Sequence, residues 1–444
     1  MSTIAQLIGT NILALIFVLG VMIFVHEFGH YAVAKFLKIR VEVFSLGFGR
    51  RLFGFRRGET DYRVSLLPLG GYVKMAGENP EDELTGSVEE FLSRPKLHRF
   101  AVAVAGPTMN ILLALAITSV NLMLGVEVPA YLHEAPVVGS IAPNSPAERG
   151  DLRIGDRVLS VGTTETATWQ DVEIAVGTAP RSPLVVSLQR QGQVLTTSVT
   201  PESAGESEIG SVGMGPYIPS IVASVEPNSP AAQAGLMPGD EVIKVKSPAA
   251  EAFAFAQSAR LIAENEGKPL EITILRGGEE FTRTITPARI RGDVRIGYVR
   301  QNPPSVMEKF GPGKALTESV ARNYHLTLLT FSIVGKIVTG QASIKAMSGP
   351  IEIARYSGAA ARAGLSPLLG FMGLISLQLG IFNLFPIPIL DGGVIFLLLI
   401  ESLIRRDLSL RVKERIFQVG FIFLILLMGI VILNDLNKSF PIFR

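Results

Sequence analysis

The sequence contains no cysteine and only five histidines among 444 residues, and its formal net charge is only +2. Without cysteine the chain forms no disulfide, holds no metal through thiolates and has no thiol nucleophile. So small a net charge gives no reason to expect nucleic acid or another strong polyanion as a partner. Any metal site must therefore be built from histidine and carboxylate side chains.

Basic residues are missing from the N-terminus, since residues 1–34 contain no lysine or arginine. A cleavable signal peptide has a basic region before a short apolar core. The apolar run here, from about Leu7 to Leu37, lacks that region and is long enough to cross a bilayer. We expect it to remain as a transmembrane helix.

Apolar residues make up 48% of the chain and gather in four long runs. The runs cover about 7–37, 100–124, 368–385 with an interrupted continuation to 403, and 416–433. A shorter run, 326–338, contains a lysine and is expected to be an interfacial amphipathic helix, not a fifth span. The expected fold class is a polytopic α-helical membrane protein with four transmembrane helices.

Basic residues orient these spans. Segment 35–99 contains twelve lysines and arginines, and the loop 405–415 contains five. Cytoplasmic loops carry such an excess, so both segments are expected in the cytoplasm. Both termini and the 125–365 insert are then expected in the periplasm, with the protein in a bacterial inner membrane.

The first span contains the motif His26-Glu27-Phe28-Gly29-His30. Ionisable side chains are costly in lipid and need compensation. One histidine alone would often be a polar contact between helices. Here, however, His26 and His30 are four residues apart, so they share a helix face and can bind one metal ion with Glu27 beside them as general base. The motif predicts a metalloprotease site inside the membrane.

A catalytic zinc site needs a third protein ligand and one open position. The best candidate is Asp391, in a segment that interrupts the third run with Pro386, Pro388 and a Gly-Gly pair. Membranes tolerate such a break only where the backbone faces protein or water. The alternative is that Asp391 merely caps a helix at a cytoplasmic turn.

The insert contains an internal repeat. The segment 141–147 recurs at 225–231, and Gly-Asp at 155–156 recurs at 239–240, each at an offset of 84 residues. A fixed offset indicates two copies of one small α+β domain.

Both copies resemble bacterial PDZ domains, with N-S-P-A followed by G-D. PDZ domains bind extended peptides at a sheet edge. A peptide-binding loop is predicted in the second copy at Ser211, Val212, Gly213 and Met214. The alternative is a spacer that keeps bulky proteins away from the membrane site.

Taken together, the motif in the first span, the N-x-x-P-x-P-x-L-D-G-G segment and the tandem PDZ copies resemble the site-2 protease family. The resemblance implies that His26, His30 and Asp391 hold one zinc ion and that Glu27 is the catalytic base. It also implies contact with the substrate backbone at Asn383, Pro386 and Pro388.

The stretch 61–75 is also similar to that family. It contains two short apolar strands around a proline and a Gly-Gly turn. The resemblance implies a re-entrant β-structure that pairs with substrate, and an ordinary cytoplasmic hairpin is the alternative. The residues expected to contact substrate are Tyr62, Val64, Leu66, Gly70 and Gly71.

The second span carries Gly106, Pro107 and Asn110, which also match the family. We expect them to support the site through close helix packing and a polar contact.

The expected domains are two membrane parts at 1–126 and 366–444, PDZ copies at 127–206 and 207–291, and a connector at 292–365. The resemblance implies cleavage within transmembrane segments of single-span proteins that have already lost their outer domain. Implied substrates are a membrane-anchored anti-sigma factor and signal-peptide remnants, as part of a stress response.

Two other functions stay open. The chain could be a non-proteolytic PDZ scaffold with a structural metal, although structural zinc normally has four protein ligands and only three candidates are found. A transporter is disfavoured by the single large insert and the lack of matched transmembrane halves.

Overall fold

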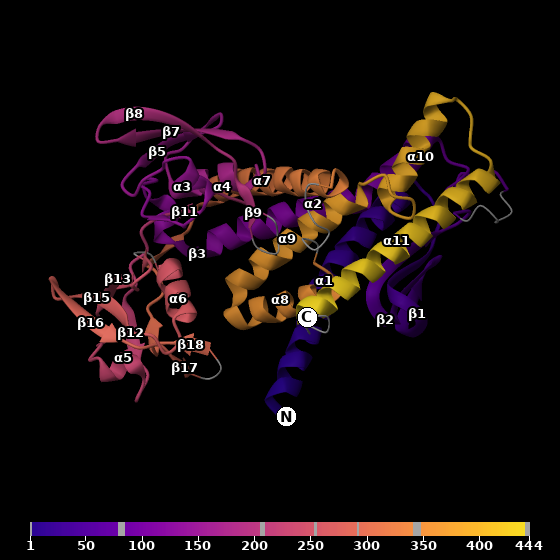
Figure 1. The fold of residues 1–444 in the computed structure, drawn as a ribbon. Coiled ribbons are helices and arrows are strands. Elements are labelled where there is room, and N and C mark those ends of the chain that lie inside the picture. Colours follow the sequence, from indigo (N-terminus) through magenta and orange to yellow (C-terminus); the bar gives the residue numbers. More distant parts are fainter. Residues whose placement is uncertain are drawn as a thin grey trace. The chain divides into compact units, whose positions relative to one another are not determined.

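The computed structural model describes residues 2–78, 85–204, 209–252, 255–290, 293–340 and 348–439. It divides into two compact units. The first unit comprises Met1–Val126 and Glu308–Arg444, and the second comprises Glu127–Met307. Figure 1 shows the chain coloured from an indigo N-terminus to a yellow C-terminus.

The first unit is mainly helical. Its helices are α1 (Ser2–Phe36), α2 (Lys96–Leu124), α7 (Pro312–Val338), α8 (Pro350–Ala363), α9 (Leu365–Asn383), α10 (Asp391–Leu403) and α11 (Leu410–Ser439). Four helices, α1, α2, α9 and α11, are long and apolar enough to cross a membrane, which agrees with the four predicted spans. The predicted interfacial segment is the C-terminal part of α7, which is not among these candidates in the described part of the chain.

Small residues bring α2 into backbone contact with its neighbours. A Cβ atom on Gly29 would lie 2.5 Å from the carbonyl oxygen of Ala105, and one on Gly380 would lie 3.0 Å from that of Pro107. Such close approach by small residues is typical of helix packing in membranes. Helix α2 therefore packs directly against both α1, which carries the histidine motif, and α9, which leads into the Asp391 segment.

A buried ion pair holds α10 in place. The Glu401 side chain is 1% exposed, and its Oε1 atom lies 2.7 Å from Nζ of Lys413 in α11. Nζ of Lys96, at the start of α2, donates to the Glu401 carbonyl at 2.8 Å. These bonds tie α10, the helix that begins with Asp391, to both α2 and α11.

Between α1 and α2 the chain forms a small sheet from β1 (Val41–Arg57) and β2 (Thr60–Met75). The first part of β1 lies between the two parts of β2, because Leu46 pairs with both Val64 and Gly71. This agrees with two strand segments joined near Pro68. The segment 71–75 pairs only with β1 among the described strands, so its other edge is open.

The second unit contains two similar repeats. The first comprises η1 (Ala130–His133), β4 (Ser140–Ile141), α3 (Pro146–Arg149), β5 (Arg157–Val161), β6 (Thr164–Glu165), α4 (Trp169–Gly177), β7 (Leu184–Arg190), β8 (Gln193–Val199), β9 (Glu202–Ala204), β10 (Ile209–Ser211) and β11 (Met214–Gly215).

The second repeat comprises β12 (Val222–Val225), α5 (Pro230–Gln233), β13 (Glu241–Lys246), β14 (Glu251–Ala252), α6 (Phe255–Glu264), β15 (Leu270–Arg276), β16 (Glu279–Ile285), β17 (Ala288–Ile290), β18 (Asp293–Arg295) and β19 (Tyr298–Arg300). The sheet orders β6-β5-β7-β8 and β14-β13-β15-β16 correspond strand for strand. Two further strands, β3 (Val126–Pro129) and β20 (Ser305–Glu308), pair where the chain enters and leaves the unit.

The segment predicted as the peptide loop of the second copy belongs to the first repeat. Val212 is buried in the first core, and its carbonyl accepts from the Ala147 amide at 2.8 Å. Ser211 accepts a hydrogen bond from the Gly213 amide, and Met214 pairs with β4. These groups are used inside the first repeat, so this assignment was wrong.

The repeat boundaries shift accordingly. The same bond recurs 84 residues later, where the Ala231 amide donates to the Ile296 carbonyl at 2.8 Å. Each repeat is thus closed by a strand that follows its main sheet. The boundary predicted at residue 206 therefore lies after Gly215, and the connector predicted from residue 292 begins only after Arg300.

Each repeat contains one buried carboxylate paired with an arginine. In the first, Nε of Arg190 lies 2.7 Å from Oδ1 of Asp156, whose side chain is 1% exposed. Burial favours the neutral acid, but the hydrogen bond from Arg190 outweighs it and holds the pKa of Asp156 below its ordinary value. Asp240 and Arg276 repeat this arrangement.

This pair predicts loss of stability in acid. A carboxyl whose folded pKa is depressed stabilises the fold above its unfolded pKa, about 3.9, and that contribution is lost as pH falls through the folded value. Trp169 is the single tryptophan and is buried in the first repeat, so its fluorescence reports that repeat alone. We expect the urea midpoint of residues 127–307 to fall below pH 4, and Asp156→Asn to lower it already at pH 7.

Asp240→Asn is the matched control, since it alters the second repeat. An equal shift of the Trp169 transition by both variants would show that the two repeats unfold together, contrary to this expectation.

Candidate active site

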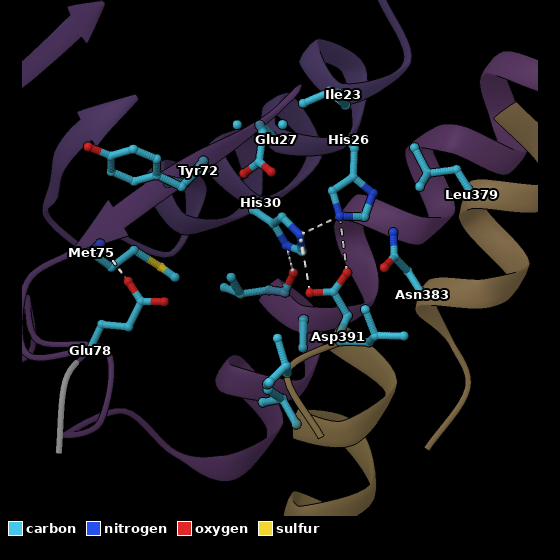
Figure 2. A pocket seen from close by; sticks show the side chains of 18 of the residues that line it. Ile23, His26, Glu27, His30, Tyr72, Met75, Glu78, Leu379, Asn383 and Asp391 are labelled. Carbon is cyan, nitrogen blue, oxygen red and sulfur yellow. Dashed lines mark hydrogen bonds and ion pairs between the residues drawn. The ribbon is translucent and has the colours of Figure 1, made fainter. Parts of the chain in front are cut away.

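Helix α1 places three ionisable side chains on one side. His26 and His30 are four residues apart, and their Nε2 atoms lie 3.2 Å from each other. The two ring centroids are 4.8 Å apart. Figure 2 shows both rings pointing at Asp391, with the Glu27 carboxylate nearby.

Asp391 reaches the histidines from the first turn of α10. Its Oδ2 lies 3.1 Å from Nε2 of His26, and its Oδ1 lies 3.4 Å from Nε2 of His30. The three residues form the one candidate metal-binding group found among the described residues.

Two glycines and one strained residue set the position of Asp391. A Cβ on Gly392 would lie 2.2 Å from the Phe385 carbonyl oxygen, and one on Gly393 would lie 2.4 Å from that of Ile387, so only glycine lets α10 start against this loop. Ile389 adopts a φ of 90°. A β-branched residue is rarely found there, and such strain is typical of functional sites.

The donor set fits zinc. Zinc bonds to histidine nitrogen at about 2.0–2.1 Å, and the edge of a tetrahedron with such bonds is about 3.3 Å. The three separations between donor atoms, 3.1, 3.2 and 3.4 Å, match that edge. A neutral imidazole pair with one carboxylate is also a common ligand set of catalytic zinc.

The other ring nitrogens have partners in α2. Nδ1 of His30 donates to the Val102 carbonyl at 2.8 Å, and Nδ1 of His26 lies 3.1 Å from the Asn110 amide group. With the Asn110 oxygen facing the ring, that amide accepts the His26 proton. Both Nε2 atoms are then unprotonated and free to bind metal. Asn110 thus makes the polar contact that the sequence predicts.

Gly106 provides the space for the metal site. A Cβ there would lie 2.3 Å from Nε2 of His30 and 2.8 Å from Nε2 of His26. Any larger residue would occupy the region on which the ring nitrogens converge. Pro107, next to it, is buried in α2 and packs against α9.

A cavity of about 480 Å³ opens beside the donors. Of the predicted substrate residues, Gly70, Gly71 and Asn383 line it. Figure 2 shows the Asn383 side chain beside Asp391. The backbone amide of Val73, on the open edge of β2, interacts with the Glu27 carboxylate.

The other predicted substrate residues do not line this cavity. Tyr62 bonds to the Tyr31 hydroxyl, Val64 pairs inside the sheet, and Leu66 is exposed. Pro388 packs where a Cβ on Gly420 of α11 would lie. These residues, together with Pro386, belong to the frame around the cavity and not to its wall.

Sequence reasoning missed several residues of the cavity wall. Among them are Phe48, Glu78 and Ile389. It also missed the Val102 carbonyl, although Val102 lies one helical turn before Gly106 and therefore on the same face. That spacing was the signal that could have predicted the contact.

Comparison with known proteins agrees with this geometry. The description of Peptidase family M50 matches residues 14–427. The Escherichia coli protein named regulator of sigma-E protease RseP is 34% identical, over 96% of this chain and 98% of its own length. Protease RseP of Yersinia pestis is 36% identical over the same shares.

A protein of Vibrio cholerae whose name includes zinc metalloprotease is 31% identical, over 96% of this chain and 98% of its own length. The family match covers most of the chain, including all three candidate ligands. The chain therefore belongs to peptidase family M50, the site-2 protease family, and is a zinc metalloprotease.

Proposed function

We propose that this protein hydrolyses peptide bonds within the transmembrane segments of single-span membrane proteins. His26, His30 and Asp391 hold the zinc ion, and Glu27 is the general base. The observation that carries this proposal is a set of three donors at zinc-ligand spacing, two of them inside a candidate membrane span.

The three donors favour catalysis over a scaffold with a structural metal. No fourth histidine or carboxylate joins the group within the residues that the structure describes. Structural zinc is normally closed by four protein ligands, whereas catalytic zinc keeps an open position. The open cavity beside the donors supports the same reading.

In the proposed reaction zinc, when bound, supplies Lewis acidity to the scissile carbonyl and to water. A carboxylate oxygen of Glu27 takes the proton of the attacking water and later gives it to the leaving nitrogen. The Val73 amide holds that carboxylate in place. Val102 and Asn110 orient the two rings, so the ligands are ready before substrate arrives.

The substrate helix must open before it can be cleaved, because its amides are bonded within the helix. Unsatisfied amides are costly in lipid. The open edge of β2 offers replacement partners next to Glu27. We propose that the unwound substrate adds to this edge as a strand.

Strand addition predicts a period of two in the substrate. Methylating one backbone nitrogen at a time along a transmembrane peptide should lower kcat/KM about tenfold at alternate positions, the effect of one lost hydrogen bond. Neighbouring positions, whose amides point away from the edge, serve as controls. Equal losses at all positions would exclude strand addition.

We propose that the second unit excludes substrates that still carry a large outer domain. The Ala130 amide donates to the Pro304 carbonyl at 2.9 Å, so the chain enters and leaves this unit side by side. A short Gly-Ser linker can therefore replace residues 131–303.

In cleavage assays that deletion should bring the rates for full-length and pre-trimmed substrate close together, whereas the complete chain prefers the trimmed form. A preference that survives the deletion would reject the filter. Slower cleavage of the trimmed substrate alone would instead indicate that the unit captures peptides.

The proposed setting is a bacterial inner membrane, with segment 35–99 and loop 405–415 in the cytoplasm and the second unit in the periplasm. The cavity then opens toward the cytoplasmic side. Because relatives are named for sigma-E regulation, we propose a membrane-anchored anti-sigma factor as one substrate and signal-peptide remnants as others.

A further inference from the structure

The open edge of β2 presents alternate amides to the cavity. The Ala76 amide donates to the Arg40 carbonyl, on the β1 side. In a strand, successive amides point in opposite directions. The amides of Gly71, Val73 and Met75 therefore point to the open edge, and Val73 meets Glu27 there.

The last of these amides already has a partner. Met75 donates to Oε2 of Glu78 at 3.0 Å, and Glu78 itself lines the catalytic cavity. Figure 2 shows the Glu78 carboxylate with one oxygen at the Met75 amide and the other directed away from it.

A fixed turn places this carboxylate. Gly77 has a φ of 62°, which lets the chain reverse directly after β2. The turn is held by backbone bonds from Phe91 to Ala76 and from Leu92 to Gly77. Glu78 is thus positioned by the same loop that ends the strand.

We propose that Glu78 is a specificity-determining residue that ends the substrate-binding edge at Val73. It occupies the Met75 amide, which a substrate strand would need in order to extend two residues further, and its negative charge repels the carbonyl oxygens of such a strand. It thereby limits the substrate to one register relative to Glu27 and selects one scissile bond. This inference rests on the proposed function and on strand addition.

The test maps the cleavage positions of one transmembrane peptide by mass spectrometry. The full-length protein should cut at one main position. Glu78→Leu keeps a similar side-chain volume but frees the Met75 amide, so a product displaced by two residues should rise about tenfold. Glu78→Gln is the matched control, because its amide oxygen can accept the same bond and should keep the original position.

Zinc content is measured for each variant as a check on the site. If Glu78→Leu loses zinc, Glu78→Asp decides, since it keeps the charge but is one methylene too short to reach Met75. A single unchanged position in a zinc-loaded Leu or Asp variant overturns the proposal, as does a shift in Glu78→Gln equal to that in Glu78→Leu. Failure of the parent protein to cut the peptide at all would instead contradict the proposed function.

Discussion

Replacing Glu27 with glutamine should lower the rate of peptide cleavage by about 10² to 10⁴-fold, the usual contribution of a general base. The amide has nearly the same shape but cannot take the proton of the attacking water. Because Glu27 is not among the three donors that face one another, the zinc content should stay near one ion per chain. Single-turnover cleavage of a transmembrane peptide and metal analysis of the purified variant check both parts.

Glu59→Gln is a suitable control, because Glu59 is an exposed carboxylate near the same helix that makes only a long ion pair with Lys35. It should cleave at the parent rate. If Glu27→Gln also cleaved at that rate, another group would have to be the base, and loss of zinc in this variant would move Glu27 into the ligand set.

Replacing Gly106 with alanine should remove both zinc and activity. The new methyl group would lie 2.3 Å from Nε2 of His30, in the space on which the donors converge. Mutations one step away from zinc ligands commonly cost 10- to 100-fold in metal affinity, and direct obstruction should cost at least that much. Zinc titration of the purified variant and its cleavage rate give the measurement.

Gly20→Ala is the matched control, since Gly20 also lies in a candidate span and a Cβ there meets nothing within 4 Å. It should keep zinc, activity and helix content. A Gly106→Ala variant that binds zinc with the parent affinity would show that the metal lies elsewhere.

The histidine motif was predictable because its geometry is local. Four residues on a helix bring His26 and His30 together in any surroundings, and Glu27 comes with them. Asp391 was predictable by chemistry and not by spacing, since a buried acid at a broken membrane helix needs a partner. The structure brings it to 3.1 Å from His26.

The end of the repeat could not be read from the motifs. The sequence signature covers the helix and the Gly-Asp turn, whereas the closing strand carries no such signature and lies after a break in the repeat. Val212 and Ile296 are 84 residues apart and make the same bond, but they are ordinary apolar residues. Only the contacts show which core each one enters.

One apparent irregularity between the repeats has a simple explanation. The helix ending at Gly150 was matched to the one ending at Gly235, which implied a shift of one residue. In the structure the left-handed position is Asp151, with a φ of 54°, and its counterpart is Gly235, with a φ of 78°. Aspartate tolerates this conformation better than most residues, so the two helix ends are equivalent.

Which half of β2 faces the cavity depended on tertiary structure. Both halves are apolar and both pair with β1, so periodicity does not distinguish them. The segment with Tyr62 lies inside the sheet, and the segment with Val73 forms the open edge. Glu78 was missed for the same reason, because its role depends on which amides the edge leaves open.

The most direct test of the account is cleavage of a labelled transmembrane peptide by the purified protein, with and without a zinc chelator, followed by mass mapping of the products. The account predicts products cut inside the apolar segment, loss of cleavage with chelator, and recovery when zinc is added back. Cleavage that persists in a preparation stripped of metal, or that falls only outside the apolar segment, would contradict it.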